Sequence, residues 1–218
     1  MKHAVITGGT SWIAQATAIK MERDGWSVYL STRDDMDVTD PASVKAYINQ
    51  FEQIDALINV AGGLNRNTER KSFLVTPPED FEAEMQTNFY SVVNVCRSAL
   101  PIMVNQGSGV IINIVSGAAL TGFPRMAAYS SAKAAVLAFT RSLAQETGIH
   151  GIRANCVLPG FTTSRWYPEP KPNIKAPSPL GRPTSPEDVG EAIAFLASDG
   201  ASHITGACLD LSGGVALH

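Results

Sequence analysis

Apolar residues occur along the chain in short continuous runs, separated by longer stretches in which they recur at helical spacing. Short β-branched runs without apolar–polar alternation are typical of strands buried on both faces of a sheet. Glycine, proline or polar residues bound these runs. The pattern predicts six strands, over residues 2–7, 26–31, 55–60, 110–115, 152–158 and 207–211.

The stretches between these runs predict helices. Asp40 followed by Pro41, and Ser185 with Asp188 three residues later, are typical helix starts. Pro101 falls within the longest helical stretch, where we expect a kink or a break. The predicted helices cover residues 11–24, 41–51, 78–106, 128–147 and 185–198.

Because strands and helices alternate from end to end, the sequence predicts a single α/β domain over residues 1–218. We expect a Rossmann-type, doubly wound parallel sheet with helices on both faces. Eight of the 13 prolines lie between Pro159 and Pro186, which excludes a long regular helix there. This segment, about 161–184, is interpreted as a substrate lid; a merely flexible crossover is the alternative.

Composition narrows the class of protein. The chain has 218 residues, 17 Lys plus Arg against 20 Asp plus Glu, and a net charge of −3. Nucleic acid is therefore a poor candidate partner. No apolar run approaches a membrane span, and Gly8 and Gly9 interrupt any signal peptide. Three widely spaced cysteines predict core thiols in the cytoplasm, and neither these nor the four histidines have metal-ligand spacing.

The first candidate motif is the turn at residues 7–14, Thr-Gly-Gly-Thr-Ser-Trp-Ile-Ala. A glycine turn between a first strand and a first helix places backbone amides and the positive helix end near a bound phosphate. By itself the motif has little specificity, because glycines also end strands for steric reasons.

A more specific group follows in the second half of the chain. Ser116 closes a strand, Tyr129 comes 13 residues later, and Lys133 lies one helical turn beyond it. We expect the ammonium to lower the pKa of the phenol, so that Tyr129 acts as general acid or base. Ser116 could donate a hydrogen bond to a reacting carbonyl oxygen. A lone Tyr-x-x-x-Lys is more often a solvated helix face, so the motif needs support from its neighbours.

That support comes from a resemblance. Ser116, Tyr129, Lys133 and the upstream Asn88, in this order, resemble the short-chain dehydrogenase/reductase family. Further matching segments are Asn-Val-Ala-Gly at 59–62, Asn-Cys-Val-Leu-Pro-Gly at 155–160, Gly-Arg-Pro at 181–183, Ile-Thr-Gly at 204–206 and Asp-Leu-Ser-Gly-Gly at 210–214. The resemblance implies that Lys133 also contacts the nicotinamide ribose and that Asn88 holds a water in the proton relay. It also implies a homo-oligomer, a tetramer or a dimer, formed through the two long helices.

The same resemblance, with the first turn and the strand ends, suggests the contacts to a nicotinamide dinucleotide. Thr163 is an alternative to Ser164 at the carboxamide end, and Trp166 and Tyr167 are candidates for the substrate pocket. The candidate cofactor contacts are Gly8, Thr10, Ser11, Trp12, Ile13, Arg33, Asp37, Val38, Asn59, Ala61, Gly62, Tyr129, Lys133, Pro159, Gly160, Thr162 and Ser164.

Some positions depart from the family's pattern. Trp12 and Ala14 replace two glycines of the first turn. Trp12 either packs outward or covers the adenosine, or else it weakens or alters cofactor binding. The enoyl-thioester reductases also replace these glycines, but their Lys follows Tyr by six residues, where this chain has Ala135. A helix and a strand usual in the family are missing between Ser31 and Pro41.

Arg33 bears on the choice of cofactor. It follows the second strand, where a guanidinium can bind the 2′-phosphate of NADP, whereas an acidic residue would select NAD. The acidic Asp34 and Asp35 that follow argue against NADP. Arg33 could also be a solvated surface charge. We favour NADP(H) over NAD(H), and predict an oxidoreductase that transfers hydride between this cofactor and a small carbonyl/alcohol substrate. The alternative is a non-catalytic dinucleotide-sensing or scaffold protein of the same fold.

Overall fold

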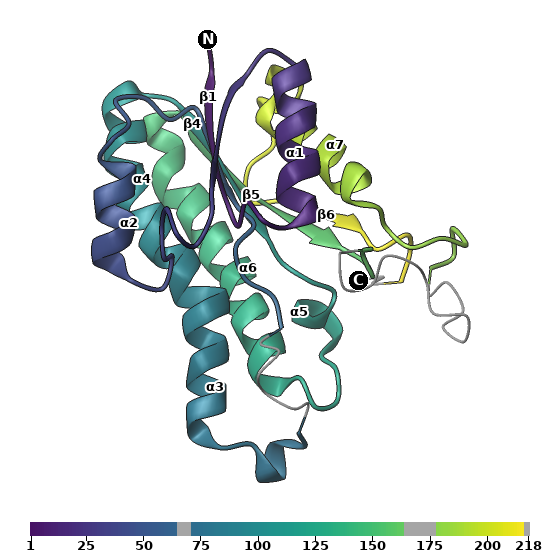
Figure 1. Cartoon of the computed structure of the whole chain (residues 1–218). Coiled ribbons are helices and arrows are strands. Elements are labelled where there is room, and N and C mark those ends of the chain that lie inside the picture. Colours follow the sequence, from purple (N-terminus) through teal and green to yellow (C-terminus); the bar gives the residue numbers. More distant parts are fainter. Residues whose placement is uncertain (65–70, 164–177, 216–218) are drawn as a thin grey trace.

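Six parallel strands form one sheet in the order β2-β1-β3-β4-β5-β6 (Figure 1). The structure, a computed structural model, describes residues 1–64, 71–163 and 178–215. The predicted doubly wound α/β sheet is confirmed, with strands close to their expected positions. They are β1 (His3–Thr7), β2 (Ser27–Ser31), β3 (Ala56–Asn59), β4 (Gly109–Ile114), β5 (Ile152–Pro159) and β6 (Cys208–Leu211).

Helices cover both faces of this sheet (Figure 1). On one face lie α1 (Trp12–Arg23) and α7 (Pro186–Ala197). On the other lie α2 (Pro41–Ile48), α4 (Ser91–Gln106) and α6 (Ala127–Thr147). The helix α3 (Pro78–Met85) extends past the sheet, with the 3-10 turn η1 (Phe73–Val75) at its far end. The remaining short elements are η2 (Gln86–Tyr90), α5 (Ala118–Thr121), η3 (Gly148–His150) and η4 (Asp199–Ala201).

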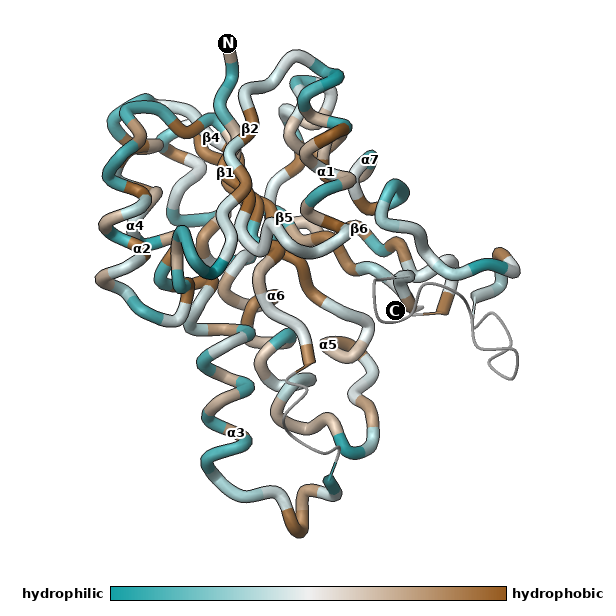
Figure 2. The backbone as a smooth tube through the Cα atoms, in the orientation of Figure 1, coloured by the Kyte–Doolittle hydropathy of each residue, from teal (hydrophilic) through white to brown (hydrophobic). Residues whose placement is uncertain are grey.

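The core consists of two apolar layers, one on each face of the sheet. Successive strand residues point to opposite faces, so Ala4 and Ile6 pack toward α1 and α7 while Val5 packs toward α2 and α4. On β3, Leu57 packs toward α2 and α4, and Ile58 packs toward α1 and α7. The most hydrophobic part of the chain therefore runs through the centre of the molecule (Figure 2).

The long helical stretch at 78–106 differs from the prediction. Helix α4 continues through Pro101, so the expected break is absent there. Pro101 is exposed, and the carbonyl that loses its amide partner can bond to water instead. The irregularity lies earlier, where η2 is one turn of π-helix between α3 and α4. The four-residue α5 is too short to leave a periodic signal in the sequence.

Two further observations concern the described ranges only. None of their helices has both the length and the apolar character that crossing a bilayer requires. Their His, Cys, Asp and Glu side chains form no group of three or more that could hold a metal ion. Cys96 and Cys156 are buried as expected, whereas Cys208 is only partly buried.

Candidate active site

Ser116, Tyr129 and Lys133 meet just beyond the carboxyl end of β4. Lys133 is 4% exposed, and its Nζ donates a hydrogen bond to the Ile114 carbonyl at 3.0 Å. The same Nζ lies 5.9 Å from the centre of the Tyr129 ring. Tyr129 is partly buried and forms a hydrogen bond with the Ser116 side chain. The structure therefore brings together three of the four residues predicted for catalysis.

Asn88, the fourth, lies in the π-helical turn η2 and is fully buried. The extra residue of this turn makes the Ser91 amide bond to the Gln86 carbonyl, one residue further back than in an α-helix. The Thr87 carbonyl instead accepts a hydrogen bond from the Ser91 hydroxyl at 2.6 Å. Single π turns within helices are frequent at functional sites, because they redirect one side chain.

The loop after β3 fixes the Asn88 side chain. Gly63 N donates to Asn88 Oδ1 at 2.8 Å, and Asn88 Nδ2 donates to Gly63 O at 3.0 Å. Gly62 has a φ of +128°, and a Cβ there would lie 3.0 Å from Asn88 Oδ1 and 3.7 Å from Lys133 Nζ. Gly62 therefore packs against the catalytic group, where a side chain would displace Asn88.

Burial dominates the electrostatics of the site. It raises the pKa of the Tyr129 phenol, although the hydrogen bond with Ser116 acts in the opposite direction. Burial also lowers the pKa of Lys133 to about 8. The expected lowering of the Tyr129 pKa is therefore wrong for this structure. The physical reason is that desolvation disfavours the phenolate, while the Lys133 ammonium bonds to the Ile114 carbonyl.

The turn after β1, predicted to bind phosphate, leads directly into the amino end of α1. Gly8 has a φ of +74°, and a Cβ there would come within 2.9 Å of Ala61 backbone atoms, so this turn touches the loop after β3. Ser11 Oγ caps α1 by accepting a hydrogen bond from Ala14 N at 3.2 Å. Trp12 is the first residue of α1 and is partly exposed. The amino end of α1 thus lies where the strand order reverses between β1 and β3, the position at which open α/β sheets bind dinucleotides.

Arg33 and Asp37 form an ion pair after β2, with 3.2 Å between Arg33 Nη2 and Asp37 Oδ2. The Arg33 side chain is 83% exposed. Asp37 also accepts hydrogen bonds from the Thr39 amide and hydroxyl, which lower the pKa of its carboxyl group. Asp35 accepts two hydrogen bonds from Thr32 and so caps the loop. Val38 packs against the core.

Asn59, a predicted cofactor contact, has a buried side chain. It is 3% exposed, and its Nδ2 donates to Asn113 Oδ1 at 2.8 Å, inside the core between β3 and β4. Asn113 in turn donates to Thr140 Oγ1 on α6 at 2.8 Å. The Asn59 side chain therefore ties the sheet to α6.

Pro159, Gly160 and Thr162, which are also predicted cofactor contacts, lie at or just after the end of β5. A Cβ on Gly160 would lie 2.8 Å from Ser212 Cα, so Pro159 and Gly160 lie close against the chain that follows β6. Thr162 pairs with Thr184, which joins the two ends of the proline-rich segment. Ser164, Trp166, Tyr167 and most of the predicted lid lie outside the described residues.

Glu84 is a polar residue of this site that the sequence analysis missed. It lies on α3, is 7% exposed, and its Oε2 accepts a hydrogen bond from Asn88 Nδ2 at 2.7 Å. A signal was present, because Glu84 precedes Asn88 by one helical turn and so shares its buried face.

With this geometry established, comparison with known proteins identifies the family. Residues 34–216 match the family model described as Enoyl-(Acyl carrier protein) reductase. The 3alpha-hydroxysteroid dehydrogenase of Mediterraneibacter gnavus is 37% identical over 243 residues, covering 97% of this chain and 96% of that protein.

Two solved structures share the fold. The 3-ketoacyl-(acyl-carrier-protein) reductase of Brucella melitensis complexed with NADH has a TM-score of 0.88 at 27% identity, covering 99% of this chain and 98% of the other. A variant of ElxO with NADPH bound has a TM-score of 0.90 at 26% identity, covering 98% of each chain. The chain belongs to the short-chain dehydrogenase/reductase family of oxidoreductases.

A first prediction concerns Lys133. The pKa of this lysine is about 8 when folded against 10.5 for an unperturbed lysine, so the unfolded chain binds more protons between these values. The free energy of unfolding of the wild type should therefore rise with pH across this window, and that of Lys133→Met should lack this rise. Between pH 8 and 10.5, the unfolding free energy of the wild type should rise by up to about 3 kcal/mol more than that of the variant. Urea unfolding of both proteins at each pH measures this difference.

Lys45→Met on α2 is the matched control, because Lys45 is exposed. Its stability should follow the wild-type pH dependence. If the Lys133→Met curve also ran parallel to that of the wild type, the lowered lysine pKa would be refuted.

Proposed function

We propose that this protein is an oxidoreductase that transfers hydride between NADP(H) and a carbonyl/alcohol substrate, with Tyr129 as the general acid or base. The observation that carries the proposal is the Ser116–Tyr129 hydrogen bond beside the buried Lys133 ammonium. The family membership and the position of the turn after β1, beside the reversal of strand order, support it.

A bound nicotinamide would supply or accept the hydride. In the reduction direction, the Ser116 hydroxyl donates a hydrogen bond to the carbonyl oxygen as negative charge develops on it. Tyr129 delivers a proton to that oxygen. Burial raises the pKa of the Tyr129 phenol, so the group is protonated near neutral pH and holds the proton that reduction requires.

Lys133 restores the proton. Its pKa of about 8 lies close to the working pH, so the ammonium is charged at pH 7 and can still release a proton. Asn88 lies next to Lys133 through Gly62, in the position expected for the link between the relay and water.

Tyr129→Phe tests this assignment. The variant keeps the ring and its packing but loses the proton donor, so we expect turnover of reducible carbonyl compounds with NADPH to fall by at least about 1000-fold. Tyr90→Phe is the control, because Tyr90 is an exposed tyrosine of η2. Turnover by Tyr129→Phe at the wild-type rate would refute the role of Tyr129.

Trp12 is the observation behind a second candidate function, that of a dinucleotide-sensing or scaffold protein without catalysis. This indole stands at the amino end of α1 where the family has glycine. If wild-type protein binds NADPH or NADH in calorimetric titrations but reduces no carbonyl compound, the second candidate is favoured. Reduction of an enoyl thioester instead of a ketone would indicate the activity named in the family model's description.

We also propose that NADPH is preferred over NADH. The support is the position of Arg33 after β2, with a mostly exposed guanidinium that is paired only at the surface with Asp37. A guanidinium binds a 2′-phosphate through charge-assisted hydrogen bonds. The solved relatives carry either cofactor, so they do not decide between the two.

Arg33→Ala should therefore weaken NADPH binding about 10-fold and leave NADH binding within about twofold. Calorimetric dissociation constants for both cofactors would measure this. Arg23→Ala, at an exposed arginine on α1, is the control. Equal changes for the two cofactors would contradict the assignment of Arg33.

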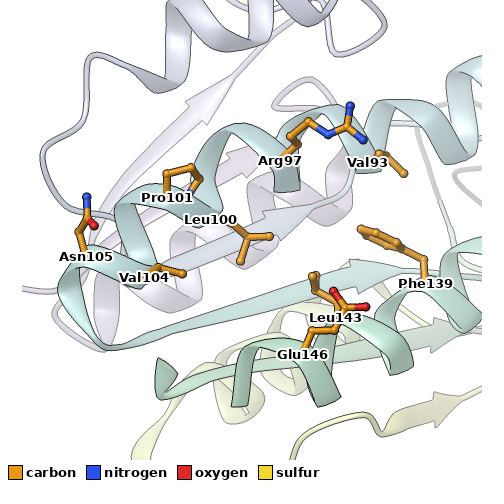
Figure 3. Close-up of a pocket in the computed structure, with 9 residues that line it drawn as sticks. All are labelled: Val93, Arg97, Leu100, Pro101, Val104, Asn105, Phe139, Leu143 and Glu146. Atoms are coloured by element: carbon orange, nitrogen blue, oxygen red, sulfur yellow. The ribbon is translucent and has the colours of Figure 1, made fainter. Parts of the chain in front are cut away.

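A second copy of the chain is the partner that we propose for the face formed by α4 and α6. A groove of about 530 Å³ runs between these helices, and Leu100 and Leu143 point into it (Figure 3). Arg97 and Glu146 also line it. A two-fold axis here would place the same apolar strip of both copies face to face and let opposite charges meet. A cytoplasmic location stays a prediction from the sequence.

Val104→Lys tests this surface, because Val104 is 36% exposed and lines the groove. A lysine there would place a long charged side chain between the apolar strips of the two copies, so the variant should shift toward monomer in sedimentation velocity. Ile19→Lys, at an exposed apolar residue of α1, should leave the assembly unchanged. An unaltered oligomer in Val104→Lys would exclude this face.

A further inference from the structure

Glu84 is a buried carboxylate within the active site for which the mechanism above has no use. A buried carboxylate is costly unless hydrogen bonds and opposite charges compensate it. One such hydrogen bond comes from Asn88, whose Nδ2 donates to Glu84 Oε2 at 2.7 Å. Helix α3, which carries Glu84, packs against α6, which carries Tyr129 and Lys133.

The hydrogen bonds of Asn88 define how this carboxylate acts. Gly63 N donates to Oδ1, which fixes the orientation of the amide, and Nδ2 then faces both Gly63 O and Glu84 Oε2. The amide is thus clamped between the loop after β3 and α3. Nδ2 also lies 3.2 Å from the Glu84 backbone carbonyl, so without the carboxylate Asn88 would keep this contact and the loop contact but lose its shorter hydrogen bond to Oε2.

The charge of Glu84 reaches both proton-transfer groups. Its negative charge raises the pKa of Tyr129 and that of Lys133, in each case against a background set by burial. The other carboxylates of α3 are Glu79, Asp80 and Glu82, of which Asp80 lies 3.8 Å from Lys71 in an ion pair.

The remaining titratable groups near the site lie on other elements. From α6, Tyr129 and Lys133 face Glu84, and the Cys156 thiol of β5 also acts on Lys133. The neighbouring η2 contributes only Tyr90, which is exposed. Within the described residues, Glu84 is therefore the carboxylate whose charge acts on the catalytic pair.

We propose that Glu84 is a positioning residue of the active site, which clamps the Asn88 amide and supplies the buried negative charge that balances the Lys133 ammonium. This inference rests on the function proposed above. When Glu84 and Lys133 are both ionised, the negative charge of the carboxylate cancels the positive charge of the ammonium. When Tyr129 has given up its proton, the carboxylate opposes the extra negative charge and drives the phenolate to take a proton back. Glu84 therefore favours the protonated form of Tyr129 and its return to that form after proton transfer.

Glu84→Gln separates charge from shape, because glutamine has the same size and can still accept a hydrogen bond from Asn88. The titration of Tyr129 is read from the ultraviolet band of tyrosinate, as the difference between each protein and the same protein carrying Tyr129→Phe. Loss of the carboxylate charge should lower the Tyr129 midpoint by about one pH unit. Glu82→Gln is the matched control, since Glu82 is an exposed carboxylate of the same helix, and it should leave the midpoint unchanged.

A purely structural role predicts a different outcome. It would lower the melting temperature of Glu84→Gln without moving the Tyr129 midpoint, and that result would overturn the proposal. Glu84→Met, of similar volume, removes the charge and the hydrogen-bond acceptor together; it should lower the midpoint as well, and it carries the test if the Gln variant does not fold. Glu84→Asp keeps the charge and should restore the wild-type midpoint.

Activity gives a second readout. In Glu84→Gln, the pH optimum of kcat/KM should move to lower pH with KM for the cofactor within about twofold of wild type, because Glu84 acts on the proton relay. The tyrosinate titration needs no turnover. It therefore tests Glu84 even if no carbonyl substrate is found, and a failure of the proposed reaction would be distinguishable from a failure of this inference.

Discussion

All six strands are parallel, and this pairing brings the loops of the candidate site to one edge of the sheet. Parallel neighbours require a crossover after each strand, so the carboxyl ends all meet at one edge of the sheet. The glycine turn after β1, the loop after β3, Ser116 after β4 and Gly160 after β5 therefore converge, although more than 150 residues separate the first from the last. The strand order reverses between β1 and β3, and open α/β sheets bind dinucleotides beside such a reversal.

At this edge the chain buries charge. Lys133 lies almost out of solvent beside a backbone carbonyl, and Tyr129 and Asn88 are packed around it. Such burial costs stability, and it also brings the lysine pKa to about 8 while moving the phenol pKa the other way. Two groups whose pKa values are pushed apart by their surroundings are suited to pass a proton in one direction. Glu84 supplies the opposite charge in the same buried space.

Close backbone packing holds these groups in place. Gly8 and Gly62 leave no room for a side chain, since an added Cβ would contact Ala61 backbone atoms or Asn88. The π turn at 86–90 directs Asn88 inward and leaves the Thr87 carbonyl to the Ser91 hydroxyl. The Asn59–Asn113–Thr140 hydrogen bonds connect the sheet to α6, the helix that carries Tyr129 and Lys133. The candidate catalytic residues are thus supported on regular elements, which limits their freedom to misalign.

The sequence by itself determined the class of fold, the approximate bounds of all six strands and the grouping of Ser116, Tyr129 and Lys133. These follow from local rules, because hydrophobic periodicity sets the elements and helical spacing places Tyr129 and Lys133 on one face. Only the tertiary structure decided the direction of the Tyr129 pKa shift, the burial of the Asn59 side chain, the π turn before α4 and the part played by Glu84. Each of these depends on how much water the surrounding elements exclude and on which distant backbone atoms come into contact, and neither quantity is contained in the spacing of residues along the chain.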